Sequence, residues 1–396
     1  MAQSFSPKKY FSKIFAHELV SELIGEHGGQ AFFEINDQTP RKLAVSMMED
    51  AIKSLDTEQR LAVTKDLSYI ASITSAHTAS LGKKIFFSTT GKEFEPEIEC
   101  ASDHDVVLYL YLRHSDITDK LAFLYPFYAS KSYISYEAKN VDHVEVDMKL
   151  TELAREFTRL TNKDDNATEQ EMNHIFIDDI LYIESQFQGA YDRSEKIDPK
   201  TGEIDRKHVT RRIASVRIAY IPKEEIVLVA GTVGKETKML FMDTFLRVVT
   251  GGGYEEKVEH YDLTPLKNLS LDFTQYNKGT PFIKASIKSV TLSYAEGKKK
   301  LRLSLPTSRD QAGMQALKDT LEELGLTDKF SSFEIVNMTF GFIFQNKEKQ
   351  DKSINVNCSI SKAKASLCPL FEYERYTKSI LKNAGVYEGF KVLEDK

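Results

Sequence analysis

Apolar residues near the beginning of the chain recur mainly at the spacing of helices. Three helices are predicted on this basis, at residues 6–29, 39–55 and 56–82. Ser6 and Pro7 offer a hydroxyl N-cap and a proline at the first helical position, and Asp56 with Gln59 forms a capping box for the third helix. A short strand is expected at residues 31–35. The first part of the chain is therefore predicted to be rich in helix.

Strand patterns follow this helical part. Residues 106–112 (VVLYLYL) are apolar enough to predict a central strand, and residues 85–88 predict a shorter one. A helix that begins at Ser115 is predicted to end before Pro126, because proline removes a helical hydrogen bond. The pattern then predicts a hairpin and a further helix, at residues 133–138 with 143–146 and at residues 149–160.

Polar segments near the middle of the chain mark the expected domain boundary. Residues 161–171 are acidic and without periodicity, and residues 188–207 contain the turn sequence DPKTG. Between them, residues 174–187 form a single apolar piece with the pattern of one strand. The predicted organisation is an acidic helix-rich domain at residues 1–161, a polar linker with one strand at 162–207, and a basic domain at 208–396.

The last part of the chain alternates between hairpins and helices. Three hairpins are predicted, at residues 212–221 with 226–230, 282–294 with 300–305, and 333–345 with 354–360. Pairing Leu292 with Leu301 puts apolar residues of the second hairpin on one face, and a change of phase predicts a bulge near Lys288 and Ser289. A helix follows each hairpin, and the first, around residues 239–249, is apolar enough to be buried. Antiparallel hairpins packed against helices define an α+β fold class.

Composition places the chain among globular proteins. It has 396 residues, of which 41% are hydrophobic and 28% charged, which suggests about two to three domains. The cysteines Cys100, Cys358 and Cys368 form no CxxC pair, which argues against a disulfide framework and a structural zinc site. No apolar run approaches the ~20 residues of a membrane span, and no signal-peptide pattern is present. We expect a cytoplasmic, bacterial protein without a cofactor and without membrane contact.

Charge is distributed unevenly along the chain. Residues 208–396 hold 29 Lys and Arg against 23 Asp and Glu, whereas residues 1–207 hold 24 against 36. Such a split is compatible with an anionic partner for the basic part, with the two parts facing each other, or with no specific role.

The most suggestive short motif is the glycine turn at residues 231–235, between a strand and a helix. Backbone amides at such a turn can hold phosphate, so Gly231, Gly234 and Lys235 are candidate phosphate-binding residues. The spacing differs from the P-loop pattern G-x-x-x-x-G-K-[S/T], and Glu236 follows the lysine. A plain tight turn is the favoured interpretation.

Metal chemistry is the next possibility that the sequence raises. Metal-capable side chains gather in one region without the spacing of a known site, namely Cys100, Asp103, His104, Asp105, His114 and Asp116. A solvated turn is the favoured interpretation, and no metal site is predicted. Glu137 and Lys139 resemble the Glu-x-Lys element of metal-dependent nucleases, which also need an Asp on a neighbouring strand.

Basic residues collect at two places in the last part of the chain. They are Arg211 and Arg212 at the start of the first hairpin, and Lys298, Lys299, Lys300 and Arg302 at the tip of the second. Such side chains neutralise phosphates, although lysine-rich edges also serve only to prevent aggregation. Our leading hypothesis is a non-catalytic macromolecule-binding protein that contacts DNA or RNA through these residues, while its acidic part contacts a protein partner. The alternatives are a metal-dependent nuclease or phosphodiesterase using Glu137 and Lys139, a nucleotide-handling enzyme using the glycine turn, and a structural subunit of an assembly.

Overall fold

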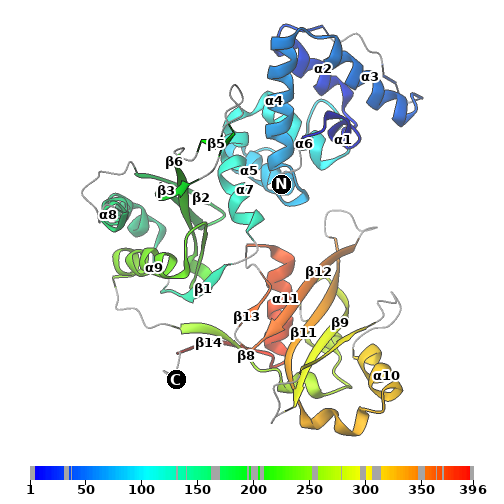
Figure 1. Cartoon of the computed structure of the whole chain (residues 1–396), viewed down its shortest axis with the longest axis vertical. Coiled ribbons are helices and arrows are strands. Elements are labelled where there is room, and N and C mark those ends of the chain that lie inside the picture. The colour runs from blue at the N-terminus through cyan, green and yellow to red at the C-terminus, as the bar shows by residue number, and fades with distance from the viewer. Residues whose placement is uncertain are drawn as a thin grey trace. The chain divides into compact units, whose positions relative to one another are not determined.

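The chain forms two compact units, Met1–Ala129 and Ser130–Lys396 (Figure 1). The computed structural model describes residues 5–30, 35–36, 38–130, 133–139, 141–161, 170–193, 196–197, 204–205, 209–251, 257–277, 279–294, 300–305, 314–346, 353–362, 364–367 and 370–392. The first unit is helical in its described residues, and the second carries antiparallel sheets and helices. The fold class is α+β, as the sequence predicted.

Helices make up the regular structure described in the first unit. They are α1 (Pro7–Phe11), α2 (His17–Glu26), α3 (Arg41–Ser54), α4 (Thr57–Ile73), α5 (Ala76–Thr90), α6 (Asp103–Arg113) and α7 (Ser115–Ala129). Asp56 caps α4 by accepting a hydrogen bond from the Gln59 backbone N at 2.8 Å, as the capping-box pattern indicates. The apolar side of each long helix is buried in a common core, to which Leu23, Met48, Leu67 and Leu121 contribute.

Two of the three strands predicted in this unit are wrong. Residues 106–112 lie in α6 and residues 85–88 lie in α5. Helices α2, α4, α5 and α7 contact α6, so nearly all sides of α6 face other helices and carry apolar residues. A run of apolar residues without helical periodicity resembles the sequence of a buried strand. Ser102 and Asp105, which form a capping box, were the available signal for a helix start here.

The predicted helix boundaries in this unit also need correction. The helix expected at residues 56–82 is divided between α4 and α5, because Ser75 caps the second helix and pairs with Thr78. Pro126 lies inside α7, which continues to Ala129, and does not end it. The helix expected at residues 6–29 is divided into α1 and α2. Most of the strand expected at residues 31–35 lies outside the described residues.

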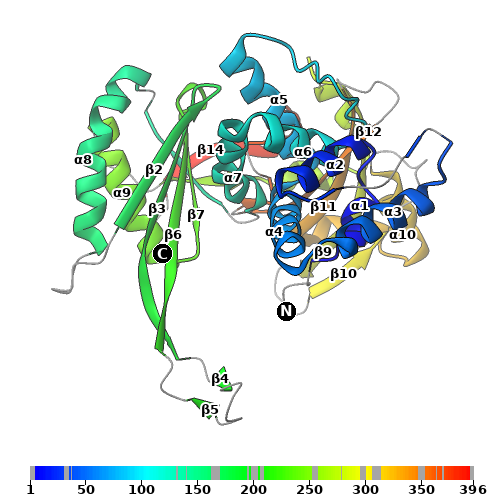
Figure 2. The same cartoon turned by 90° about the horizontal axis from the view of Figure 1, so that it is seen from above.

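The second unit begins with a sheet of order β1-β7-β6-β3-β2 in which every neighbouring pair is antiparallel. Its strands are β1 (Ile134–Glu137), β2 (Gln170–Ile177), β3 (Ile180–Arg193), β6 (Val209–Ile221) and β7 (Ile226–Gly231). Helices α8 (His143–Thr161) and α9 (Lys235–Thr250) lie together on one face of this sheet (Figure 2). The hairpin predicted from β6 and β7 and the burial of α9 are confirmed: Phe241 and Phe245 of α9 are almost fully buried.

The segment expected to be a linker at residues 162–207 contributes β2 and β3 to this sheet. The single strand expected at residues 174–187 is a hairpin, because Asp178 and Asp179 turn the chain with φ of 51° and 62°. Two residues of positive φ fit a tight hairpin turn, but the Asn-Gly or Asp-Gly signal of such turns is missing. The expected strand at residues 143–146 is the start of α8. The compact units divide between residues 129 and 130, so the boundary expected at 162–207 lies within the second unit.

A second sheet of order β10-β9-β11-β12-β13 follows, again antiparallel throughout. Its strands are β9 (Phe282–Tyr294), β10 (Lys300–Ser304), β11 (Phe333–Gln345), β12 (Ser353–Ser361) and β13 (Lys364–Ala365). The predicted pairing of Leu292 with Leu301 is confirmed. The predicted bulge is confirmed too: Ser289 faces Thr339 and Ile287 faces Phe340, which leaves Lys288 as the extra residue.

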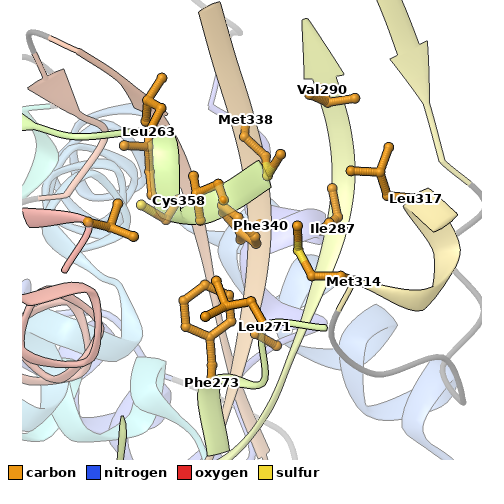
Figure 3. Packing of buried hydrophobic residues seen from close by; sticks show 14 of the residues in the cluster. Leu263, Leu271, Phe273, Ile287, Val290, Met314, Leu317, Met338, Phe340 and Cys358 are labelled. Carbon is orange, nitrogen blue, oxygen red and sulfur yellow. The ribbon is translucent and has the colours of Figure 1, made fainter. Parts of the chain in front are cut away.

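One face of this second sheet is covered by helices. Met338 and Phe340 of β11 point toward Phe273, Met314 and other apolar side chains in a shared core (Figure 3). The covering elements are α10 (Gln315–Glu323), α11 (Glu372–Asn383) and the short helices η2 (Thr264–Lys267) and η3 (Phe273–Tyr276). A small sheet of β8 (Lys257–Tyr261) and β14 (Tyr387–Val392) joins the end of the chain to the segment that follows α9.

Candidate nucleic-acid interface

The basic residues predicted to bind nucleic acid lie on two different sheets. Arg211 and Arg212 belong to β6 of the first sheet, where Arg211 pairs with Tyr191 of β3. Lys300 and Arg302 are exposed on β10, at the edge of the second sheet. Lys298 and Lys299 lie outside the described residues. The predicted set is therefore two separate groups.

The strand that carries Arg211 and Arg212 is part of a two-stranded ribbon. Strand β2 pairs with β3 only as far as Phe187, and β7 pairs with β6 only as far as Val216. Beyond these points β3 and β6 continue as a pair to Arg193 and Val209. The short strands β4 (Lys196–Ile197) and β5 (Ile204–Asp205) lie near the far end of this ribbon (Figure 2).

The group on β10 is part of a larger polar surface. Directly opposite residues of an antiparallel pair share a face, so the registers of β9 to β13 assign each side chain to the helix-covered face or to the other. We call the second surface the open face. It comprises Lys284, Ser286, Lys288, Ser289, Thr291, Ser293, Lys300, Arg302, Ser304, Glu334, Asn337, Thr339, Gly341, Ile343, Gln345, Ser353, Asn355, Asn357, Ser359, Ser361 and Lys364. All of these except Gly341 are exposed or half-buried.

The charge of the open face is positive. Its cationic side chains are those of Lys284, Lys288, Lys300, Arg302 and Lys364. Glu334 is the only carboxylate among the open-face positions that the structure describes, and Lys362 forms an ion pair with it. That ion pair lowers the pKa of Glu334, so the carboxylate is ionised and neutralised by its partner at neutral pH. The surface therefore favours an anionic ligand.

Lys288 is held over the middle of the open face. It is the bulged residue of β9, and its Nζ donates a hydrogen bond to Oδ1 of Asn357 on β12. To reach that partner the side chain crosses Gly341 of β11, where a Cβ would lie 2.7 Å from Lys288 Cε. A glycine at this position leaves room for the lysine. Because an ammonium carries three donors, hydrogen bonding to Asn357 leaves capacity for a phosphate oxygen.

Hydroxyl and amide groups lie on the same face as this lysine. Oγ1 of Thr339 donates to Oγ of Ser359 at 3.2 Å, and Oγ of Ser359 donates to Oδ1 of Asn337 at 3.1 Å. These three side chains link β11 to β12 on the open face. Small hydroxyl and amide groups beside cations are the groups that proteins use to contact phosphates and sugars of nucleic acids.

The glycine turn at residues 231–235 has the predicted strand–turn–helix context, but strand pairing explains its first glycine. Gly231 has φ of 144°, and a Cβ there would lie 2.1 Å from the backbone O of Ser215. The Thr232 backbone N donates to the same oxygen at 2.9 Å. Gly234 is the N-cap of α9, and Lys235 is its first residue. The close approach of two strands therefore accounts for Gly231 without a phosphate.

Glu137 is the last residue of β1, and Lys139 lies two residues beyond it. Tyr136 and Ala138 are buried in the core under α8 and α9, whereas Glu137 and Lys139 are exposed. The neighbouring strand is β7, and its residues are IVLVAG. The strand beside β1 thus offers no aspartate of the kind that a Glu-x-Lys nuclease requires.

The region around Asp105 is held together by structural hydrogen bonds. Oδ1 of Asp105 accepts from the backbone N of Phe15 at 2.8 Å and of Ala16 at 3.1 Å, and Oδ2 accepts from the backbone N of Ser102 at 2.8 Å. This fully buried carboxylate stabilises the break between α1 and α2. Burial raises the pKa of the nearby Cys100 thiol to about 12, so the sulfur is a protonated, poor metal ligand at neutral pH.

Similarity to known proteins gives no further assignment. Neither the known protein families nor the curated proteins include a match to this chain. Among the residues that the structure describes, no cluster of His, Cys, Asp and Glu is suited to holding a metal ion. Within the same residues, no helix has both the length and the apolar character needed to cross a bilayer.

Sequence reasoning identified the cations of β10 but not the surface to which they belong. Asn357, Gly341 and Lys364 were missed as members of a candidate site. The alternation of Asn355, Asn357 and Ser359 with buried residues in β12 was the signal that could have placed them.

Proposed function

We propose that this protein binds nucleic acid without catalysis, through the sugar-phosphate backbone, on the open face of its second sheet. The observation that carries the proposal is the collection of Lys284, Lys288 and Arg302 with hydroxyl and amide groups on one face. Cations neutralise phosphates and release counterions, while hydroxyls and amides hydrogen-bond to phosphate and sugar oxygens. The proposal replaces the predicted hairpin edge with a surface several strands wide.

The position of Lys288 favours this proposal over a role in preventing aggregation. Protective lysines belong on edge strands, where they block pairing with another sheet. Lys288 lies on β9, which has β10 on one side and β11 on the other. Its ammonium also forms a hydrogen bond with Asn357. A held cation in the interior of a sheet face is better explained by an anionic ligand.

The enzyme alternatives have less support. The strand paired with β1 carries no acidic residue, and Gly231 is explained by its close contact with Ser215. We further propose that the protein works in the cytoplasm, since the number and spacing of its three cysteines are not those of a disulfide framework. The acidic first part of the chain is proposed to contact a protein partner, on the basis of its charge alone.

The test is fluorescence anisotropy with labelled DNA and RNA, each as a duplex and as a single strand, at about 50 and about 200 mM salt. The double variant Lys288→Gln/Arg302→Gln should bind roughly tenfold to a hundredfold more weakly than the native chain, because two charge-assisted contacts are lost. For this variant, the slope of log affinity against log salt concentration should be less steep by about two, one for each phosphate contact.

The matched control is Lys318→Gln/Lys329→Gln. These exposed lysines lie in α10 and η4 (Thr327–Ser332), and α10 packs on the helix-covered face of the same sheet. This control removes the same charge and should retain native affinity. Equal weakening by both double variants would assign the binding to net charge, and no binding at the lower salt would overturn the proposal.

A further inference from the structure

We infer that the open face takes double-stranded rather than single-stranded nucleic acid. The inference rests on the proposed function and adds the class of ligand. Its basis is the chemistry of the side chains on this face, the separation of the cations, and the ribbon formed by β3 and β6.

The open face lacks the groups on which single strands depend. Proteins bind unpaired strands largely by stacking bases on Phe, Tyr, Trp or His side chains. The described open-face positions hold Ser, Thr, Asn, Gln, Lys, Arg, Glu, Gly and Ile, and none is aromatic. The phenylalanines of β9 and β11 point the other way and are buried in the core, at Phe282, Phe333, Phe340, Phe342 and Phe344. A face without stacking groups suits a ligand whose bases are already paired and stacked.

The cations of the open face are spread over several strands. Arg302 is on β10, whereas the end of the Lys288 side chain lies over Gly341 of β11. Strands β10 and β11 are two spacings apart in the order β10-β9-β11-β12, which is about 10 Å at about 4.8 Å per spacing. The two cations also differ in position along the strands, because Arg302 pairs with Thr291 and Gly341 pairs with Ser286. Cations so far apart can contact phosphates of both backbones that line a groove of a duplex.

The ribbon of β3 and β6 points to the same class of ligand. A two-stranded ribbon is one of the elements that a major groove admits. The paired residues beyond Phe187 and Val216 have no further strand beside them among the described residues, and the sequence places Arg211 and Arg212 on this ribbon. This observation depends only on the backbone pairing of the first sheet and is independent of the open face.

The test uses the full chain and competition between a short labelled duplex and the single strand of the same sequence, once with DNA and once with RNA. The duplex should bind at least roughly tenfold more tightly than the single strand at about 100 mM salt, because stacking of unpaired bases contributes about 1–3 kcal/mol each where it exists. Lys288→Gln/Arg302→Gln should weaken duplex binding, and Lys318→Gln/Lys329→Gln should not.

The outcomes separate the inference from the proposed function. Single strands that bind as tightly as duplexes would overturn the inference and leave nucleic-acid binding intact. Tight duplex binding that ignores Lys288→Gln/Arg302→Gln would place the duplex elsewhere and also overturn it. Failure to bind either form would overturn the proposed function itself. A preference for the RNA duplex over the DNA duplex would agree with the inference and indicate contacts to the 2′-hydroxyl.

Discussion

Among the described residues of the second unit, glycine occurs at two close contacts, Gly231 and Gly341, and the two contacts differ in what surrounds them. At Gly231 the obstacle to a side chain is the backbone O of Ser215, which is fixed by strand pairing. At Gly341 the nearest obstacle is Cε of Lys288, near the end of a flexible side chain. The first glycine is therefore a requirement of the fold, whereas the second allows a cation to lie flat on the open face.

Gly231→Ala should destabilise the protein strongly. Its φ of 144° is unfavourable for a residue with a Cβ, and the added atom would meet the Ser215 oxygen. Strain of this kind costs about 1–3 kcal/mol or more, measured as the free energy of unfolding in denaturant. Gly234→Ser is the control: this N-cap has φ of −63° and no atom within 4 Å of the place where a Cβ would lie, and serine is a favoured N-cap. Equal stability of Gly231→Ala and the native chain would contradict the strand-contact explanation.

At the scale of elements, α9 shows how burial on the first sheet depends on orientation. Phe241 and Leu240 are adjacent in this helix, yet Phe241 is 1% exposed and Leu240 is 44% exposed. The Phe241 ring lies 4.7 Å from that of Phe157 of α8 and stacks on Phe187 of β3 at 5.5 Å. Phe241 thus joins two helices and a strand of the same core.

Phe241→Ala should lower the free energy of unfolding by about 3–5 kcal/mol, because it removes a large buried ring and leaves a cavity. Leu240→Ala, one residue earlier, should lower it by less than about 1 kcal/mol, since that side chain is largely exposed. Both variants are measured by denaturant unfolding followed by circular dichroism. Comparable losses from the two substitutions would show that α9 packs on the sheet in a different orientation.

Elements with one covered face were the ones that the sequence could predict. The hairpins of β9 with β10 and β11 with β12 alternate between core and open-face residues, so their register and the bulge at Lys288 follow from the pattern. In α6, by contrast, neighbouring helices bury nearly all sides, and no periodicity remains to distinguish helix from strand. The turn at Asp178 and Asp179 lacks glycine and was missed for that reason.

The candidate site was predictable only in part, because it is a property of the assembled sheet. The sequence places Lys300 and Arg302 on one hairpin, but the contact of Lys288 with Asn357 joins residues 69 positions apart. That contact depends on β11 lying between β9 and β12, which hairpin patterns alone do not specify. A surface several strands wide thus becomes visible only once strand order is known.

At the scale of the whole molecule, the position of the domain boundary has a direct consequence for folding. A boundary between residues 129 and 130 keeps β1, α8, β2 and β3 with the rest of the first sheet. A cut at 207, as the charge split and the polar stretch predicted, would separate β3 from β6. Strand β3 pairs with β6 from Leu181 to Arg193. Such a cut would also remove the buried side chains of α8 and β3 from the core that they share with α9.

A chain of residues 130–396 should therefore unfold cooperatively by circular dichroism and bind a nucleic-acid duplex with native affinity and salt dependence. In a chain of residues 208–396, β6 and α9 should be cleaved readily by protease, because the fragment loses the strands and helix that bury their apolar faces but keeps the separate core of the second sheet. Lys288→Gln/Arg302→Gln in the longer fragment serves as the binding control. If β6 and α9 of the shorter fragment resist protease as they do in the longer one, the boundary lies near residue 207. If the longer fragment folds but has lost its affinity, residues 1–129 contribute to the binding surface, and the open face is not sufficient.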